Sequence, residues 1–232
     1  MSIQRLLVVA LALALATAGF AYPNFNATTG IVGVPNALTV AGGAFIGAAD
    51  ISFQDDTQVI LRAIYGLGPN FEVGGLIGLG DNNSFGVTGK YRFQFLGPSL
   101  DTAVGLSFAD ADEAGSGFQL FLVGSRMILG EPDEDMSILG SLGVTFTDFE
   151  ELSGILPFVG AQLMLPGNLE VCGEFVLEAG DFTESIFSLL LRKQFTETWA
   201  AQVGFTNATG FLGTGDSDLF IGASYAFGAG EL

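Results

Sequence analysis

Residues 84–95 read SFGVTGKYRFQF and alternate between two kinds of side chain. One set of alternate positions is apolar around a single glycine: Phe85, Val87, Gly89, Tyr91, Phe93 and Phe95. The other set is small or polar: Ser84, Gly86, Thr88, Lys90, Arg92 and Gln94. Successive side chains of a strand point to opposite faces. The segment therefore predicts a strand with one apolar face and one polar face that meets water.

The same alternation recurs along the chain and predicts twelve strands of similar length. Their expected ranges are 44–54, 58–66, 70–80, 84–95, 101–109, 117–128, 136–147, 155–165, 169–179, 185–195, 199–207 and 218–227. A tilted strand needs about 9–11 residues to cross a bilayer. The pattern predicts an all-β protein, a single antiparallel up-and-down transmembrane β-barrel of about 12 strands.

Composition favours the barrel over a soluble secreted β-sandwich, which also alternates. Hydrophobic residues make up 49% of the chain and the mean hydropathy is +0.52, yet the formal net charge is −18. Apolar and acidic residues must therefore be sorted in space. Aromatic residues gather near both ends of the expected strands, as they do at the two membrane interfaces of a barrel.

The N-terminus resembles a secretory signal peptide, with Arg5 followed by an apolar stretch and small residues that end at Ala21. The sequence thus divides into a signal peptide (1–21), an N-terminal periplasmic or lumenal segment (22–43) and a barrel (44–232). Turns after even-numbered strands are short, with the exception of the long and acidic connection 130–135. Loops after several odd-numbered strands are expected to be longer, as at 110–117, 147–154 and 207–218. This asymmetry indicates the outer membrane of a diderm bacterium, with the longer loops outside.

Most charged residues within the strands share the wet face and are predicted to line the lumen. They are Asp50, Arg62, Glu72, Lys90, Arg92, Glu170, Glu174, Glu178 and Arg192. Hairpin geometry places Glu72 beside Arg62 and Arg92, and Arg192 between Glu170 and Glu174. The lining serves either as a set of structural ion pairs or as a ladder that recognises solutes.

Bulky apolar residues on the same inward phase predict a partly filled lumen and a narrow or closed pore. They are Ile60, Ile64, Phe121, Val176 and Leu190.

The outer loops concentrate carboxylates. The expected acidic rim comprises Asp55, Asp56, Asp81, Asp110, Asp112, Glu113, Asp148, Glu150, Glu151, Asp181, Glu184, Asp216 and Asp218. One interpretation is solubility of an exposed edge. The other is a negative mouth that concentrates cations, or binds divalent ions that bridge to lipopolysaccharide.

Enzymatic chemistry finds little support in the sequence. Histidine is absent and Cys172 is the single cysteine, so the common proton shuttle, the most common metal ligand and an intrachain disulfide are all missing. We expect no catalytic residues, cofactor or metal site. A chain this acidic is also a poor partner for nucleic acid.

Residues 28–43, TTGIVGVPNALTVAGG, resemble the opening of a group of bacterial outer-membrane barrels that includes the YjbH-type proteins, associated with exopolysaccharide export. The resemblance implies location more than activity. The segment Leu219–Phe227 is similar to the terminal strand read by the barrel-assembly machinery, although five residues follow it here.

The sequence therefore predicts a non-enzymatic outer-membrane barrel that forms a narrow channel for small solutes or ions. The alternative is a structural or envelope-biogenesis barrel linked to surface polysaccharide. The expected partners are outer-membrane lipid and lipopolysaccharide, the barrel-assembly machinery during insertion, and divalent cations at the rim.

Overall fold

The computed structural model describes residues 27–28, 30, 32–53, 57–80, 83–95, 97, 99–111, 115–130, 136–150, 153–177, 185–196, 198–209 and 213–227. For residues 111, 208–209 and 213–218 it describes the backbone alone. The predicted signal peptide, residues 1–21, lies outside the described residues.

The described chain contains twelve strands, each close to its predicted range. They are β1 (Phe45–Phe53), β2 (Thr57–Gly68), β3 (Phe71–Leu79), β4 (Ser84–Phe93), β5 (Asp101–Ala111), β6 (Gly115–Leu129), β7 (Ser137–Phe149), β8 (Ser153–Leu165), β9 (Leu169–Val176), β10 (Ile186–Thr196), β11 (Trp199–Thr209) and β12 (Gly213–Phe227).

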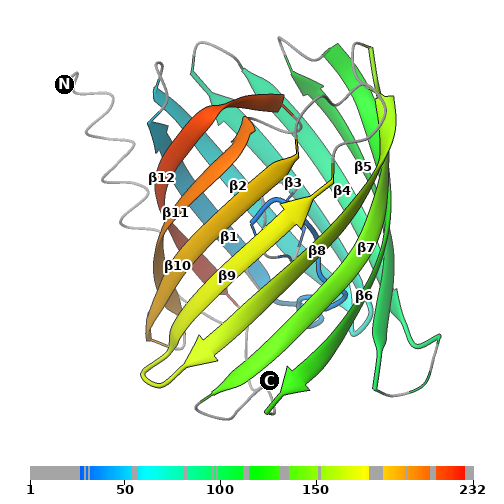
Figure 1. The fold of residues 1–232 in the computed structure, drawn as a ribbon, viewed down its shortest axis with the longest axis vertical. Coiled ribbons are helices and arrows are strands. Elements are labelled where there is room, and N and C mark those ends of the chain that lie inside the picture. The colour runs from blue at the N-terminus through cyan, green and yellow to red at the C-terminus, as the bar shows by residue number, and fades with distance from the viewer. Residues whose placement is uncertain are drawn as a thin grey trace.

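Every strand pairs antiparallel with the next strand in the sequence, and β1 pairs with β12 to close the sheet into a barrel (Figure 1). The closing pair runs from Phe45, opposite Phe227, to Ser52, opposite Phe220. A closed sheet leaves no edge strand unpaired. The prediction of a 12-stranded up-and-down barrel is confirmed.

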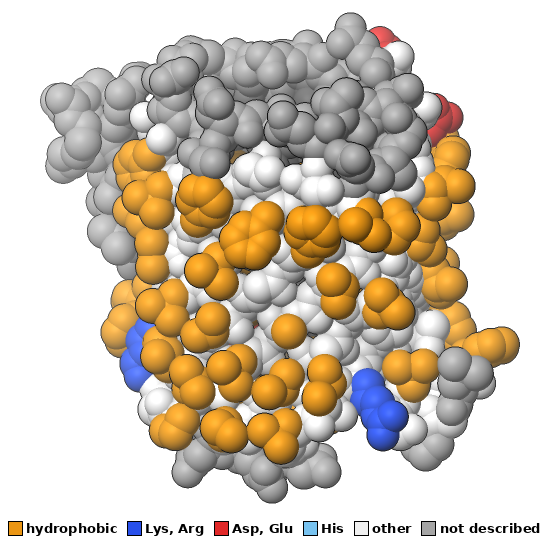
Figure 2. Space-filling model, in the orientation of Figure 1, with side chains coloured by type: hydrophobic (Ala, Val, Ile, Leu, Met, Phe, Trp, Pro, Cys, Tyr) orange, Lys and Arg blue, Asp and Glu red, His pale blue; other side chains and the backbone are white. Residues whose placement is uncertain are grey.

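Side chains alternate between the outer wall and the lumen. On β4, Val87 and Tyr91 are 44% and 49% exposed, whereas Thr88 and Lys90, on the other phase, are 5% and 0% exposed. The outer wall carries a broad belt of apolar side chains (Figure 2). Apolar side chains exposed over a whole surface are unfavourable in water and favourable against hydrocarbon.

Strands on the loop side extend further than predicted. β5 and β6 continue to Ala111 and from Gly115, β7 ends at Phe149, and β12 begins at Gly213. Much of the expected loops 110–117, 147–154 and 207–218 is therefore strand. The alternation of apolar and polar residues is weaker at these strand ends because both faces can meet water there. The hydrogen-bonded ladder between the strands does not require that alternation.

Part of the inner wall is built from cross-strand pairs of phenylalanine and glycine. Phe121 lies over Gly105 of the neighbouring strand, and the pairs Phe158–Gly143 and Phe220–Gly204 repeat the arrangement. In each case a Cβ on the glycine would overlap the ring. The glycines therefore give the rings room to lie flat against the wall, where each is 2% exposed.

The turn-side rim carries aromatic pairs and two outward-facing basic residues. Phe195 and Trp199 pack edge to face with centroids 4.8 Å apart. Arg126 is exposed, and Lys193 donates to the carbonyl of Gly167 in the β8–β9 turn. Figure 2 shows basic side chains low on the apolar belt. Long stems at such positions can carry the charge to the interface.

A search of the described residues for a helix long and apolar enough to cross a membrane finds none.

Candidate functional site

The described charges of the predicted lining all lie on the inward face and are largely buried. They are Asp50 on β1, Arg62 on β2, Glu72 on β3, Lys90 and Arg92 on β4, Glu170 and Glu174 on β9, and Arg192 on β10. Glu178 lies outside the described residues. A charge in such a place is stable only when an opposite charge or several hydrogen bonds accompany it.

The pairing of these charges differs from the prediction for Glu72. The strand register puts Glu72 opposite Lys90, and their Oε1 and Nζ atoms lie 2.9 Å apart. Arg62 pairs with Asp50 across the β1–β2 hairpin, and Arg92 pairs with Asp101 at 2.7 Å.

The expected neighbours of Glu72, Arg62 and Arg92, were wrong because both hairpin registers differ from those assumed. Arg62 stands opposite Leu76 of β3, four residues beyond Glu72, and the β2–β3 register shifts between Gly66 and Gly68. Short turns do not reveal such shifts in the sequence.

Arg192 binds Glu170, its cross-strand neighbour, with Nη1 and Oε2 2.8 Å apart. The cross-strand neighbour of Glu174 is Ser188. The expected position of Arg192 between the two glutamates was wrong, because Leu190 stands opposite Cys172 between them and Arg192 stands opposite Glu170.

The segment before β1 lies inside the barrel, where the ribbon before β1 can be seen between the strands (Figure 1). We call the described residues between 27 and 41, namely 27–28, 30 and 32–41, the N-terminal loop. Its chain folds back on itself at an antiparallel bridge between Gly30 and Pro35. Of the two predicted places for the N-terminal segment, periplasm or lumen, the described part occupies the lumen.

The tip of the N-terminal loop binds Glu174 through three consecutive backbone N–H groups. The amides of Val32 and Val34 donate to Oε2 at 2.9 and 3.1 Å, and the amide of Gly33 donates to Oε1 at 2.7 Å. Consecutive amides that converge in this way form an anion-binding concavity. The tip thus compensates a carboxylate that is 3% exposed.

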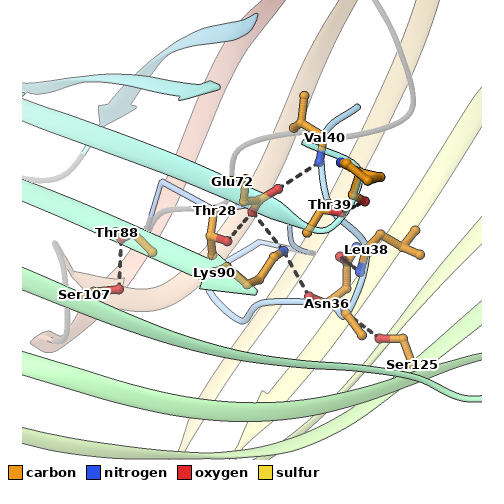
Figure 3. Close-up of polar contacts among 12 residues, drawn as sticks. Thr28, Asn36, Leu38, Thr39, Val40, Glu72, Thr88, Lys90, Ser107 and Ser125 are labelled. Carbon is orange, nitrogen blue, oxygen red and sulfur yellow. Dashed lines mark hydrogen bonds and ion pairs between the residues drawn. The ribbon is translucent and has the colours of Figure 1, made fainter. Parts of the chain in front are cut away.

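Both ends of the N-terminal loop meet at Glu72, as Figure 3 shows. The hydroxyl of Thr28 donates to Oε1 at 2.6 Å, and the amide of Val40 donates to Oε2 at 2.9 Å. Lys90 donates to the carbonyl of Asn36 at 3.2 Å in addition to its ion pair with Glu72. One ion pair of the wall therefore fixes the start, the middle and the end of the loop.

A third set of contacts ties the loop to the opposite wall. The side-chain amide of Asn36 donates to the side-chain oxygen of Gln162 at 2.9 Å, and the backbone N–H of Ala37 donates to the hydroxyl of Ser125 at 2.9 Å. Gln162 in turn donates to Glu170, the partner of Arg192. The loop is thus hydrogen bonded to strands on several sides of the lumen.

Two glycines of the wall let the loop backbone approach closely. A Cβ on Gly74 of β3 would overlap the carbonyl oxygen of Ala27, and one on Gly66 of β2 would overlap that of Ala41. Both positions face inward, so side chains there would fill the space that the loop occupies. Glycine is the residue that permits such backbone contact.

Apolar side chains of the loop pack against the inward hydrophobic residues that the sequence pointed to. Val32, Val34 and Ala37 belong to one buried cluster with Phe121, Val176 and Leu190 of the wall. Ile64 belongs to a second cluster with Val40, and Ile60 is half-buried. The lumen is filled along the loop by both polar and apolar contacts.

Sequence patterns did not indicate Ser125 and Gln162 as partners of the N-terminal loop, nor Asp101 as the ion-pair partner of Arg92. Asp101 begins the expected strand 101–109, while serine and glutamine on an inward face are ordinary for a water-lined lumen. Gly74, on the inward phase of β3, is the one sequence signal of a close backbone contact at this place.

The structure describes only part of the predicted acidic rim. Asp110, Asp148 and Glu150 are exposed at the loop side, and Ser116 donates to Asp110 at 3.0 Å. Asp216 and Asp218 lie in β12, where the backbone alone is described. The remaining members lie outside the described residues: Asp55, Asp56, Asp81, Asp112, Glu113, Glu151, Asp181 and Glu184.

Within the described ranges, no group of three or more His, Cys, Asp or Glu side chains is arranged to hold a metal ion.

Comparison by sequence finds no family model and no curated protein that matches the chain. Comparison by structure finds porins. The KdgM porin superposes with a TM-score of 0.62 at 13% identity, over 78% of this chain and 99% of that one. The NanC porin gives 0.57 at 9% identity, over 78% and 98%. The outer membrane protein Omp33 of Acinetobacter baumannii gives 0.57 at 12% identity, over 80% and 98%. At these identities the likeness concerns the fold, a closed antiparallel barrel of the kind that these outer-membrane porins form.

Proposed function

We propose that this chain is an outer-membrane channel that passes small solutes or ions through a narrow lumen and has no enzymatic activity. The observation that carries the proposal is the opposition between an apolar outer wall and a lumen lined with charged side chains. Such a barrel is stable in a bilayer and offers a polar path across it. The likeness in fold to the KdgM and NanC porins supports the same interpretation.

The proposed location in the outer membrane follows from the proposed signal peptide and from the apolar outer wall of the barrel. Residues 1–21 direct the chain across the inner membrane, and the barrel-assembly machinery reads the end of β12 near Phe227. The loop-side rim, with exposed Asp110, Asp148 and Glu150, then faces the outside. There it concentrates cations, or binds divalent ions shared with lipopolysaccharide.

The test combines location with conductance. We expect the protein in the outer-membrane fraction, with detergent needed for extraction and a heat-dependent shift in gel migration. In planar bilayers of neutral lipid we expect small conductance steps and a reversal potential that indicates a modest preference for cations. Extraction without detergent, or a preference for anions, would contradict the proposal.

A scaffold in envelope biogenesis is the second candidate, because the N-terminal loop fills much of the lumen and residues 28–43 resemble the opening of YjbH-type barrels. This function predicts a deletion strain with altered surface polysaccharide or a weakened envelope, whereas the purified barrel would not conduct. Normal polysaccharide output and a normal envelope in that strain would count against the scaffold.

A further inference from the structure

The described charges of the lumen do not balance. The inward carboxylates are Asp50, Glu72, Asp101, Glu170 and Glu174, and the inward cations are Arg62, Lys90, Arg92 and Arg192. The four cations form ion pairs with the first four carboxylates.

Glu174 is left without a cation among the described lumenal residues. Its negative charge is compensated by the loop amides of residues 32–34 and by the hydroxyl of Ser188. The loop tip therefore does for Glu174 what a basic side chain does for each of the other lumenal carboxylates.

The N-terminal loop is not part of the barrel ladder. The sheet closes between β1 and β12 without it, and the one described strand-like bridge of the segment, Gly30–Pro35, is internal to the loop. Its hydrogen bonds to the strands involve strand side chains, and the hydroxyl of Thr39 also donates to the carbonyl of Pro69 in the β2–β3 turn. The loop can therefore leave the lumen while every strand pair of the barrel stays intact.

The loop joins β1 through a tight glycine turn. Gly43 has a φ of +84°, which favours glycine, and its amide donates to the carbonyl of Gly66 at 2.8 Å. Ala44 donates back to Ala41 at 3.0 Å. Rotation at Gly42 and Gly43 would swing the loop relative to the wall without changing the first residues of β1.

We propose that the N-terminal loop is a removable plug and that Glu174 is its anchor and, in the open lumen, the charge that favours cations. This inference rests on the proposed channel function and deepens it by naming the residue and the ion class. When the tip withdraws, Glu174 loses its amide donors, keeps the hydroxyl of Ser188 and faces the water of the lumen as a carboxylate without a cation. A cation that enters then meets a site of matching charge.

Two variants of Glu174 separate the anchor from the charge. Glu174→Gln weakens the contacts to the loop amides and removes the charge, so open probability in single-channel recordings of the full mature protein should rise about tenfold or more. Cation preference should fall in the same recordings. Glu174→Asp keeps the charge but draws it back by one methylene, so openings should also become more frequent while cation preference is retained.

Asp101→Asn is the matched control for opening. It makes the same change of carboxylate to amide in the lumen, but the ion-pair partner of Asp101 is Arg92, on the neighbouring wall strand. Its open probability should equal that of the wild type. Heat-dependent gel migration shows which variants are folded barrels.

The outcomes distinguish the two proposals. If the wild type conducts and Glu174→Gln opens no more often than Asp101→Asn, the plug and its anchor are wrong while the channel function stands. If folded wild type and folded Glu174→Gln both fail to conduct, the channel function is wrong as well. Frequent openings in both Glu174 variants, with cation preference lost in Glu174→Gln alone, support the inference in full.

Discussion

The barrel wall and the N-terminal loop are stabilised in different ways. Each wall strand is joined to two neighbours by a continuous ladder, for example eleven residue pairs between β5 and β6. The loop touches the wall through separate contacts to a few side chains, chiefly Glu72, Glu174, Ser125 and Gln162. A ladder tolerates the loss of one contact, whereas an isolated anchor does not.

This contrast implies that substitutions in the wall change stability, while substitutions at the loop contacts change occupancy of the lumen. The ion pair between Arg192 and Glu170 lies in the wall but reaches the loop through Gln162 and Asn36. It is therefore the place where the two kinds of effect should be most strongly mixed.

Arg192→Met should give the largest loss of stability. It leaves Glu170 buried without its cation, and breaking a buried pair in this way costs about 3–5 kcal/mol. The free energy of unfolding in urea, measured in lipid vesicles, tests this. The double variant Arg192→Met/Glu170→Gln removes the orphaned charge and should recover most of the loss; an equal loss in both would contradict the account.

Leu122→Arg tests the outer wall without touching the loop. Leu122 lies at the middle of β6 on the apolar face and is 48% exposed, so a charge there costs about 2–4 kcal/mol at the bilayer midplane. The same change at Ile128, near the turn-side rim on the same face, should cost about 0–1 kcal/mol. Equal costs at the two positions in vesicle unfolding would show that the wall does not face lipid.

Gly105→Ala tests the packing of rings on the inner wall. The new methyl group would overlap the ring of Phe121, and overpacking of this kind costs about 1–3 kcal/mol. Gly173→Ala on β9 is the control, because a Cβ there has no neighbour within 4 Å. Unfolding in urea should separate the two variants; indistinguishable midpoints would argue against the ring placement.

Of these four substitutions, Gly74→Ala should change the free energy of unfolding least and the frequency of channel openings most. Its methyl group would occupy the place of the Ala27 carbonyl and displace the loop without altering any charge. We expect more frequent openings in planar bilayers than in the wild type. Gly75→Ala, on the outer face of the same strand, meets only ordinary contacts and should leave openings unchanged. Similar recordings from the two variants would mean that the loop is not what limits conductance.

The wall could be predicted from the sequence and the loop could not, for one physical reason. In a strand such as β4, apolar and polar residues alternate with a period of two, since one face meets lipid and the other meets water. Residues 32–34 and 37 carry no such period, because their backbone amides bind single side chains more than 80 positions away. Nothing local in Val32 or Gly33 indicates a carboxylate partner.

The charge pairs of the lumen could be predicted in part. The inward phase of Glu72, Lys90 and Arg62 was readable, because alternation fixes the face. Their partners were not, because register depends on turn geometry, and the shift between Gly66 and Gly68 leaves no clear mark in the sequence. Two residues of register separate the predicted neighbour of Glu72 on β4, Arg92, from the observed one, Lys90.

The most direct test is to tether the N-terminal loop to the wall and record the current. Ala37→Cys and Ser125→Cys, in a Cys172→Ala background, place two thiols where the Ala37 amide now binds the Ser125 hydroxyl. Oxidation, or a short bis-methanethiosulfonate linker, should join them and suppress openings, and reduction should restore the current. A linked protein that conducts as freely as the reduced one would contradict a lumen closed by this loop.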